Sequence, residues 1–311
     1  MSQQSPLNST YFVSVIIPIF NDIQGLKICL EAIKNQTYPQ TFFEVIVIDN
    51  ASNNSDSIKN LTKQYNNVLY EYESKIGSYA ARNKGLSVAR GEIIAFTDAD
   101  CIPADDWLEK GIIKLSSVFN CGLIGGKINL IYLQEKPITP VELYESVMAF
   151  RQEEFITENH FSVTANMFTW KKVIEKVGFF NDNLKSSGDL DWGRRVYASG
   201  YFQLYASDVS VTHPSRYSFS QLYKQTIRHT GGIYDLYLRS EFPKTEGIYL
   251  FLKYILLNLM PPVSFALKIF KNPQIDKLKD KFTIILVFFL VRLITLLEIC
   301  RLLLGKNSSR E

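Results

Sequence analysis

The stretch Gly91–Leu108 reads GEIIAFTDADCIPADDWL and contains an apolar run that ends in two acidic residues. Ile93–Thr97 is continuously apolar, as expected of a strand that is buried on both faces of a sheet. Asp98 and Asp100 follow this strand directly. Ligands of open α/β sheets bind beyond the carboxyl ends of the strands. The stretch therefore predicts a buried sheet with a polar site at its edge.

Three earlier runs repeat this pattern and alternate with helices. Val13–Ile17 (VSVII), Glu44–Ile48 (EVIVI) and Val68–Tyr72 are predicted strands. Asp22 is suited to cap a helix after the first strand, and Ser78–Ala89 is predicted to form another helix. Such alternation favours an α/β layer with a mostly parallel sheet.

The order of elements is looser from Gly122 to about Val211, and Ser218–Leu238 is predicted to be a helix. No internal repeat or low-complexity linker is visible, so one domain is expected over residues 1–240. Residues 241–311 are more apolar and form a separate region.

The bulk composition excludes some classes of partner. The 311 residues carry a net charge of only +3, which gives no reason to expect nucleic acid as a ligand. The four cysteines have no C-x-x-C spacing, so reduced thiols are expected. The N-terminus lacks the basic and apolar segments of a signal peptide, which favours a cytoplasmic start.

Two of the predicted strands are followed by aspartates. Asp49 comes after the second strand, and Asp98 and Asp100 after the fourth. Mg²⁺ and Mn²⁺ accept carboxylate oxygens together with the phosphate oxygens of a ligand. The alternative is a solvated turn whose aspartates cap the following helix.

Four stretches together resemble the inverting family 2 glycosyltransferases, which have the GT-A fold. Their order and spacing agree over roughly the first 120 residues, and they read VSVIIPIFN (13–21), EVIVIDNAS (44–52), GSYAARNKG (77–85) and GEIIAFTDADCIPADDWL (91–108). The resemblance implies an α/β, GT-A-type nucleotide-sugar-binding domain with a mixed, mainly parallel sheet at residues 1–240. It also implies metal-dependent, inverting sugar transfer from a nucleotide-diphosphate donor, with Mn²⁺ or Mg²⁺ as the cofactor.

The same resemblance assigns roles on the donor side. Asp49 would hydrogen-bond the base of the donor, and Pro18 would shape the floor of the base pocket. Arg82 would lie near the base and the diphosphate, although a salt bridge on the helix surface is the alternative. Asp98 would meet the ribose or the metal, and Asp100 would be the principal metal ligand.

Gly178–Tyr201 resembles the acceptor-side segment of the family, which usually shows Glu-Asp, an acid two residues on, and then Arg. Here Asp189 and Asp191 are present, but Gly188 replaces the Glu. By register Asp189 is the expected general base, and Asp191 is the competitor. The alternative is that one acid caps the helix and the other pairs with Arg195.

Two further assignments concern residues beyond this segment. The resemblance implies that His213 completes the metal shell or touches the diphosphate, and the alternative is a hydrogen-bonded structural histidine. Arg228–Gly232 could form a flexible loop near the diphosphate, since its two glycines permit close backbone approach.

The C-terminal region contains two apolar segments, Ile248–Phe270 and Phe282–Leu304, each near the ~20 residues needed to span a bilayer. Pro261-Pro262 would interrupt the first, and Arg292 lies near the centre of the second. We therefore expect helices that lie in or re-enter the membrane interface. Two ordinary spans, or a soluble helical extension, are the alternatives.

The leading hypothesis is a glycosyltransferase at the cytoplasmic face of the membrane. Its partners would be a nucleotide-sugar donor, a glycan or lipid-linked acceptor in polysaccharide, glycolipid or cell-envelope glycan synthesis, and membrane lipids. The alternatives are a nucleotidyltransferase acting on sugar phosphates and a non-catalytic scaffold of the same fold. The first is disfavoured because PIFNDIQG holds only Gly25, not a glycine-rich phosphate loop.

Overall fold

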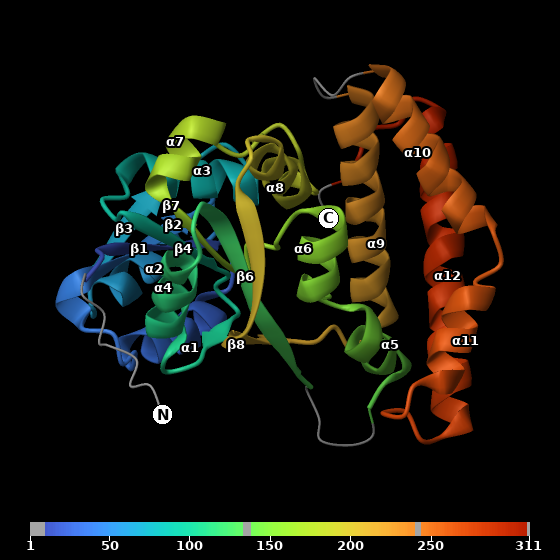
Figure 1. Cartoon of the computed structure of the whole chain (residues 1–311), viewed down its shortest axis with the longest axis horizontal. Coiled ribbons are helices and arrows are strands. Elements are labelled where there is room, and N and C mark those ends of the chain that lie inside the picture. The colour runs from blue at the N-terminus through green and yellow to red at the C-terminus, as the bar shows by residue number, and fades with distance from the viewer. Residues whose placement is uncertain (1–9, 133–137, 240–243, 310–311) are drawn as a thin grey trace. The chain divides into compact units, whose positions relative to one another are not determined.

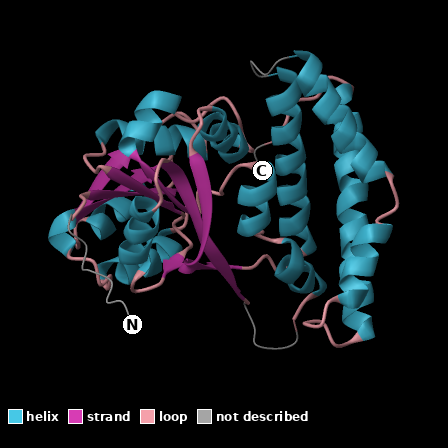
Figure 2. Ribbon diagram, in the orientation of Figure 1, coloured by secondary structure: helices cyan, strands magenta, loops and turns pink. Residues whose placement is uncertain are grey.

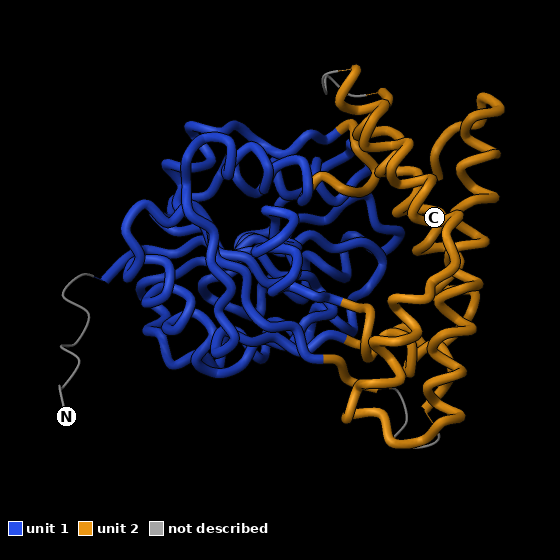
Figure 3. Tube along the Cα trace, turned by 45° about the vertical axis from the view of Figure 1, so that its right-hand side comes forward, with its two compact units in different colours: residues 1–129, 150–182, 189–213 blue, residues 130–149, 183–188, 214–311 orange. Residues whose placement is uncertain are grey.

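The computed structural model describes residues 10–132, 138–239 and 244–309. The chain forms two compact units (Figure 3). Unit 1 comprises the residues up to 129 together with 150–182 and 189–213, and unit 2 comprises residues 130–149, 183–188 and 214–311. The regional boundary predicted at residue 240 stays a prediction.

The described strands form one mixed, eight-stranded sheet (Figure 2) with the order β3-β2-β1-β4-β7-β6-β8-β5. The first four strands in this order are parallel, whereas β7 is antiparallel to β4 and β6, and β5 to β8. The strands are β1 (Val13–Ile19), β2 (Phe43–Asp49), β3 (Val68–Tyr72), β4 (Ile93–Thr97), β5 (Ile102–Pro103), β6 (Cys121–Ile131), β7 (Asn166–Trp170) and β8 (Phe202–Pro214).

Helices cover both faces of the sheet in unit 1, with α3 and α7 on one side and α1 and α4 on the other (Figure 1). The apolar runs of β1, β2 and β4 are buried throughout because both faces are covered. The helices of this unit are α1 (Ile23–Lys34), α2 (Ser55–Thr62), α3 (Ser78–Val88), α4 (Trp107–Ser117), α6 (Gln152–Asn159), α7 (Lys171–Val177) and α8 (Gly188–Ala198), with a 3₁₀ turn η1 (Gln40–Phe42).

The first helix begins with the capping residue that the sequence predicts. The Asp22 side chain caps α1 by accepting a hydrogen bond of 2.9 Å from the backbone N–H of Gly25. Leu26 and Leu30 of α1 are buried in the same core as β1. The parallel strands therefore end at one edge of a rigid layer, where the predicted site residues follow.

Unit 2 is helical and contains the predicted helix at Ser218–Leu238. Its elements are α5 (Pro140–Met148), α9 (Phe219–Tyr234), a π-helical turn η2 (Asp235–Arg239), α10 (Lys244–Leu259), α11 (Val263–Lys271) and α12 (Leu278–Leu303). The flexible loop predicted at Arg228–Gly232 is wrong, because these residues lie inside α9. The two glycines serve close packing: an added Cβ would lie 2.9 Å from Ser308 at Gly231 and 2.6 Å from Ser186 at Gly232.

The apolar segments of unit 2 differ in continuity. Among the described residues, α12 is the one helix long and apolar enough to cross a membrane. The pair α10 and α11 passes the same test only together, and it is bent by 62° where Pro261 and Pro262 interrupt it, as predicted. Arg292 of α12 donates a hydrogen bond of 2.7 Å to the carbonyl oxygen of Met260 at this break.

Candidate active site

Pro18 and Asp49 lie near the carboxyl ends of the neighbouring strands β1 and β2. Pro18 is partly exposed and pairs in register with Ile48. The carboxylate of Asp49 is fully buried and accepts hydrogen bonds from the Ser52 N–H at 2.9 Å and the Tyr70 hydroxyl at 3.0 Å. Burial acts to raise the pKa of Asp49, but these hydrogen bonds and one from Ser55 outweigh it, so the pKa is lowered.

Arg82 and Asp98 form a close ion pair at the edge of the sheet. Arg82 projects from α3, and its Nη2 lies 2.6 Å from Oδ1 of Asp98, which directly follows β4. Arg82 is only 4% exposed, so the alternative of a salt bridge on the helix surface is wrong. Its Nε has no hydrogen-bond partner among the described residues. Arg82 therefore retains a buried N–H group at the site that can donate a further hydrogen bond.

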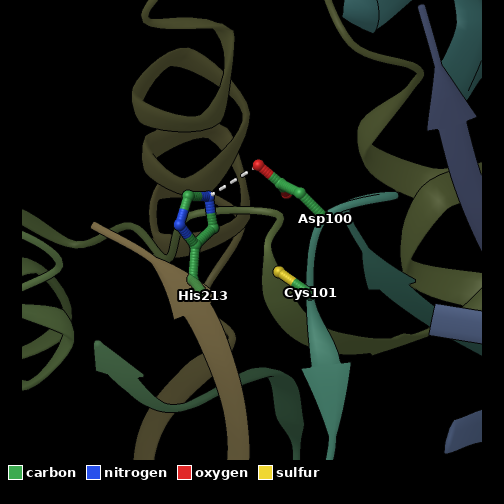
Figure 4. A group of neighbouring side chains, drawn as sticks. All are labelled: Asp100, Cys101 and His213. Atoms are coloured by element: carbon green, nitrogen blue, oxygen red, sulfur yellow. Dashed lines mark ion pairs between the residues drawn. The ribbon is translucent and has the colours of Figure 1, made fainter. Parts of the chain in front are cut away.

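A second group consists of Asp100, Cys101 and His213 (Figure 4). One ligand atom of each lies within 4.8 Å of the others, and Nε2 of His213, in β8, is 3.4 Å from Oδ2 of Asp100. Cys101 is fully buried, and its Sγ lies 3.8 Å from the carbonyl oxygen of Ala165. Burial, together with Asp98 and Asp100, raises the pKa of this thiol well above its ordinary value. Of the three residues, Asp100 and His213 offer the oxygen and nitrogen atoms that could hold an ion such as Mn²⁺, which disfavours sulfur ligands.

Asp98 is not part of that group, because its carboxylate is directed to Arg82 instead. The two aspartates still affect one another. Burial raises the pKa of Asp100, and the negative charge of Asp98 adds to the shift, while His213 opposes it.

Asp189 lies in the first turn of α8 and is brought to the same edge. Its carboxylate accepts a hydrogen bond of 3.1 Å from the backbone N–H of Thr164, and the Tyr79 hydroxyl also donates to it. Burial raises the pKa of Asp189, although the positive charge of Arg82 opposes this shift. Arg82 thus has two carboxylates in its neighbourhood, Asp98 and Asp189, and together they raise its pKa despite its burial.

Asp191 has a different environment although it is only two residues away. Its Oδ2 accepts a hydrogen bond of 3.0 Å from Nε of Arg195, one helical turn later. The same guanidinium donates to the carbonyl oxygens of Val177 and Phe179. Asp191 therefore helps to fasten α8 to the segment that follows α7, as the alternative from the sequence describes for one of the two acids.

The sequence did not identify the polar side chains that connect these loops. Asn21 accepts a hydrogen bond from the Asn53 N–H at 2.8 Å, and Ser52 accepts one from the Asn21 N–H at 2.9 Å. Asn50 is buried and donates to the carbonyl oxygens of Glu73 and Lys75 at 3.0 and 2.8 Å. Asn21 and Asn50 lie within the matching stretches, so position in a motif was the available signal.

A cavity of about 650 Å³ in unit 1 lies away from these residues. It is at the opposite edge of the sheet, where the parallel strands begin, and its lining includes Tyr11, Gly91 and Trp170. None of the predicted site residues lines it. We therefore base the site on the convergence of side chains at the carboxyl edge rather than on this cavity.

Comparisons with known proteins agree with this geometry. The model of Glycosyl transferase family 2 matches residues 14–178, and that of Glycosyl transferase family group 2 matches residues 141–303. Glycosyltransferase AglE of Haloferax volcanii is 34% identical over 256 residues, which are 80% of this chain and 82% of that relative. Dolichyl N-acetyl-alpha-D-glucosaminyl phosphate 3-beta-D-2,3-diacetamido-2,3-dideoxy-beta-D-glucuronosyltransferase of Methanococcus voltae is 27% identical over 235 residues, 70% of this chain and 71% of the relative.

Solved structures give the same fold. The mannosyltransferase PcManGT from Pyrobaculum calidifontis, in complex with GDP-Man and Mn²⁺, superposes with a TM-score of 0.65 at 18% identity, covering 96% of this chain and 89% of that one. Residues 1–349 of S. aureus TarS in complex with UDP give a TM-score of 0.53 at 18% identity, covering 87% and 77%. The sequence matches, together with this shared architecture, establish that the chain is a glycosyltransferase of family 2 with the GT-A fold.

Proposed function

We propose that this chain transfers a sugar, with inversion, from a nucleotide-diphosphate donor to an acceptor hydroxyl, using a divalent cation and Asp189 as the general base. The observation that carries the proposal is the convergence of Asp98, Asp100, His213 and Asp189 with Arg82 at the carboxyl edge of the sheet. Sugar transfer is favoured over nucleotidyl transfer or a non-catalytic scaffold because it gives Asp189, beside Arg82, a role as the base.

A divalent cation fits the donor set. Asp100 and His213 offer an oxygen and a nitrogen atom 3.4 Å apart, a ligand set that suits Mn²⁺. Asp98 adds a carboxylate that could change its partner from Arg82 to the ion. When bound, the cation would neutralise negative charge on the departing nucleoside diphosphate.

The side chains have distinct roles in this reaction. Arg82 would bind an oxygen atom of the nucleotide-sugar donor through its Nε, which has no hydrogen-bond partner in the described part of the chain. Asp189 would accept the proton of the acceptor hydroxyl as the acceptor oxygen forms its bond to the anomeric carbon. The bond between that carbon and the diphosphate oxygen breaks on the opposite face, and the nucleoside diphosphate leaves with the electron pair. The half-buried carboxylate of Asp189 has a raised pKa that favours acceptance of this proton, and the positive charge of Arg82 lies in its neighbourhood.

Recognition of the nucleotide base of the donor by Asp49 requires a small rearrangement of the hydrogen bonds around this carboxylate. This carboxylate is fully buried and already holds the hydroxyl of Tyr70 and the N–H of Ser52. We propose that the donor base displaces the Tyr70 hydroxyl, which is one of the side-chain groups that donate to this carboxylate. Pro18 and the connected loops after β1 and β2 would then bound the base.

Thermal shift with UDP and GDP, each with and without Mn²⁺, tests the donor side. A rise in melting temperature that needs both nucleotide and Mn²⁺ is the expected result. The matched variant is Arg82→Lys, which keeps the positive charge but loses the planar guanidinium group. It should reduce the rise in melting temperature. Equal shifts with and without Mn²⁺ would contradict metal-dependent donor binding.

We propose a lipid-linked acceptor at the cytoplasmic face of the membrane. In unit 2, exposed apolar side chains recur three or four residues apart along α12, namely Leu278, Phe282, Leu286, Phe289, Leu293 and Leu297. This spacing places them on one face of the helix, where acyl chains could cover them. The relative from Methanococcus voltae, whose name gives a dolichyl phosphate-linked sugar as its substrate, supports this class of acceptor.

We further propose that α10, α11 and α12 lie in or re-enter the interface and do not form two complete spans. A reporter cysteine at Asn272 tests this in intact cells. The background should be Cys300→Ser, since Cys300 is the exposed native cysteine and the other three are buried. Shielding from membrane-impermeant reagent is expected, and ready labelling from outside would establish two spans.

A further inference from the structure

Asn83 belongs to the stretch GSYAARNKG, and its side chain forms a two-way contact with a distant backbone segment. Its Nδ2 donates a hydrogen bond of 2.8 Å to the carbonyl oxygen of Phe180, and its Oδ1 accepts one of 3.0 Å from the N–H of the same residue. One amide thus satisfies both polar backbone groups of Phe180, which lies 97 residues along the chain. The contact joins α3, which carries Arg82, to the segment that leads into α8, which carries Asp189.

The side chain of Phe180 continues this connection toward the proposed base. Its buried ring stacks on Tyr79 at a centroid distance of 5.8 Å and contacts Trp192 at 5.3 Å. Trp192 lies one helical turn after Asp189 in α8 and is fully buried. Tyr79 in turn donates its hydroxyl to Asp189. The segment that Asn83 holds therefore packs against both the helix of Asp189 and a hydrogen-bond partner of its carboxylate.

We propose that Asn83 is a positioning residue for Asp189, which sets the place of the base relative to the donor side of the site. This inference rests on the proposed function, because it requires Asp189 to be the base. Asn83 is on the face of α3 that contacts Phe180, whereas Arg82 is directed to Asp98. Loss of Asn83 should therefore move Asp189 and leave the donor-binding residues in place.

Asn50 provides a matched control on the donor side. It is also an asparagine whose amide bridges backbone segments, since it accepts from the Gly77 N–H at 2.8 Å and donates to Glu73 and Lys75. Its contacts hold the loop after β2 against the start of α3, beside Asp49. Asn50→Ala should weaken donor binding, whereas Asn83→Ala should reduce turnover.

The experiment measures three quantities for each variant: melting temperature, the Kd of UDP and GDP with Mn²⁺, and kcat for release of nucleoside diphosphate from UDP-glucose and GDP-mannose with water as the acceptor. For Asn83→Ala we expect kcat to fall about 10²-fold, the scale of a misplacement near 1 Å, with the nucleotide Kd unchanged. Asn83→Asp, which keeps the acceptor for the Phe180 N–H but loses the donor, should give the same pattern if the alanine variant folds poorly.

A double-mutant cycle separates positioning from a general structural effect. If Asn83 acts through Asp189, Asn83→Ala should reduce kcat no further in an Asp189→Asn background. Independent, multiplying effects of the two substitutions, or a shared loss of nucleotide binding in the Asn83 and Asn50 variants, would overturn the proposal. Full activity of Asp189→Asn alone would instead refute the proposed base, and so distinguishes the two failures.

Discussion

Asp189 and Asp191 are two residues apart, and the structure predicts opposite consequences when each is changed to asparagine. Asp191 forms a partly exposed pair with Arg195, with 19% and 35% of the two side chains accessible. Exposed pairs contribute roughly 0.2–1 kcal/mol, and this one belongs near the upper end because Arg195 is also held by two carbonyl oxygens. A loss of about 1 kcal/mol lowers the melting temperature by about 2–4 °C in a domain of this size.

Asp189→Asn should have the opposite effect: it should keep the melting temperature and lower the turnover. Burial raises the pKa of Asp189 in the folded protein, so the charged carboxylate opposes folding at pH values above its folded and unfolded pKa. An amide removes that cost, and the melting temperature at neutral pH should not fall. Turnover should fall by about 10² to 10⁴, the scale of one general base.

Differential scanning fluorimetry and nucleoside diphosphate release, on the same samples at pH 7, measure both signatures. The expected result is an inactive, stable Asp189 variant and an active, less stable Asp191 variant. An inactive Asp191→Asn protein with unchanged melting temperature, beside an active Asp189→Asn protein, would refute the reasoning and shift the base by two residues.

Three further predictions concern the metal and the base. Asp100→Ala should abolish activity and the stabilisation by Mn²⁺ while the fold persists, because a ligand is lost; full activity of the native enzyme in excess EDTA would contradict this. Cys101→Ser should keep the Mn²⁺ response, because Mn²⁺ prefers oxygen and nitrogen ligands to sulfur; loss of the response would place sulfur in the metal shell. The pH profile of kcat should lose activity as pH falls through a pKa above the ordinary Asp value of about 3.9, because burial raises that of Asp189; an acid limb at or below that value would contradict the assignment.

The parallel half of the sheet could be predicted because its strands are buried on both faces. The mainly apolar runs of β1, β2 and β4 fit strands that are buried on both faces; Asp49 is the last residue of β2, and Asp98 and Asp100 come within three residues of the end of β4. The antiparallel half of the sheet was harder to predict from the sequence. Strands such as β8 alternate in burial, and their partner strands are far apart in sequence. The helix at Phe219–Tyr234 was predicted, but its glycine pair suggested a loop because the packing of Gly231 and Gly232 is invisible in the sequence.

At the site, a contact between residues close in sequence could be predicted, whereas contacts between residues far apart in sequence could not. The contact of Asp191 with Arg195 has the spacing of neighbours on a helix and was foreseen as an alternative. The contacts of Asp189 with Thr164 and Tyr79 join elements that only the tertiary fold brings together. For that reason the sequence could place Asp189 by register, but could not show what surrounds it.

The charges at the carboxyl edge give a physical reason for a cation in this reaction. Asp98, Asp100 and Asp189 are three acidic groups, whereas Arg82 is the cation that interacts with both Asp98 and Asp189. Burial raises the pKa of Asp100 although His213 opposes the shift, and it raises the pKa of Asp189 although Arg82 opposes it. A nucleotide diphosphate would add further negative charge to the same place. Without a cation, the negative charge of the donor would therefore be repelled by the acidic groups already at this edge. A divalent ion beside Asp100 and His213 would turn this repulsion into attraction, and it would leave Arg82 to bridge the donor and the base.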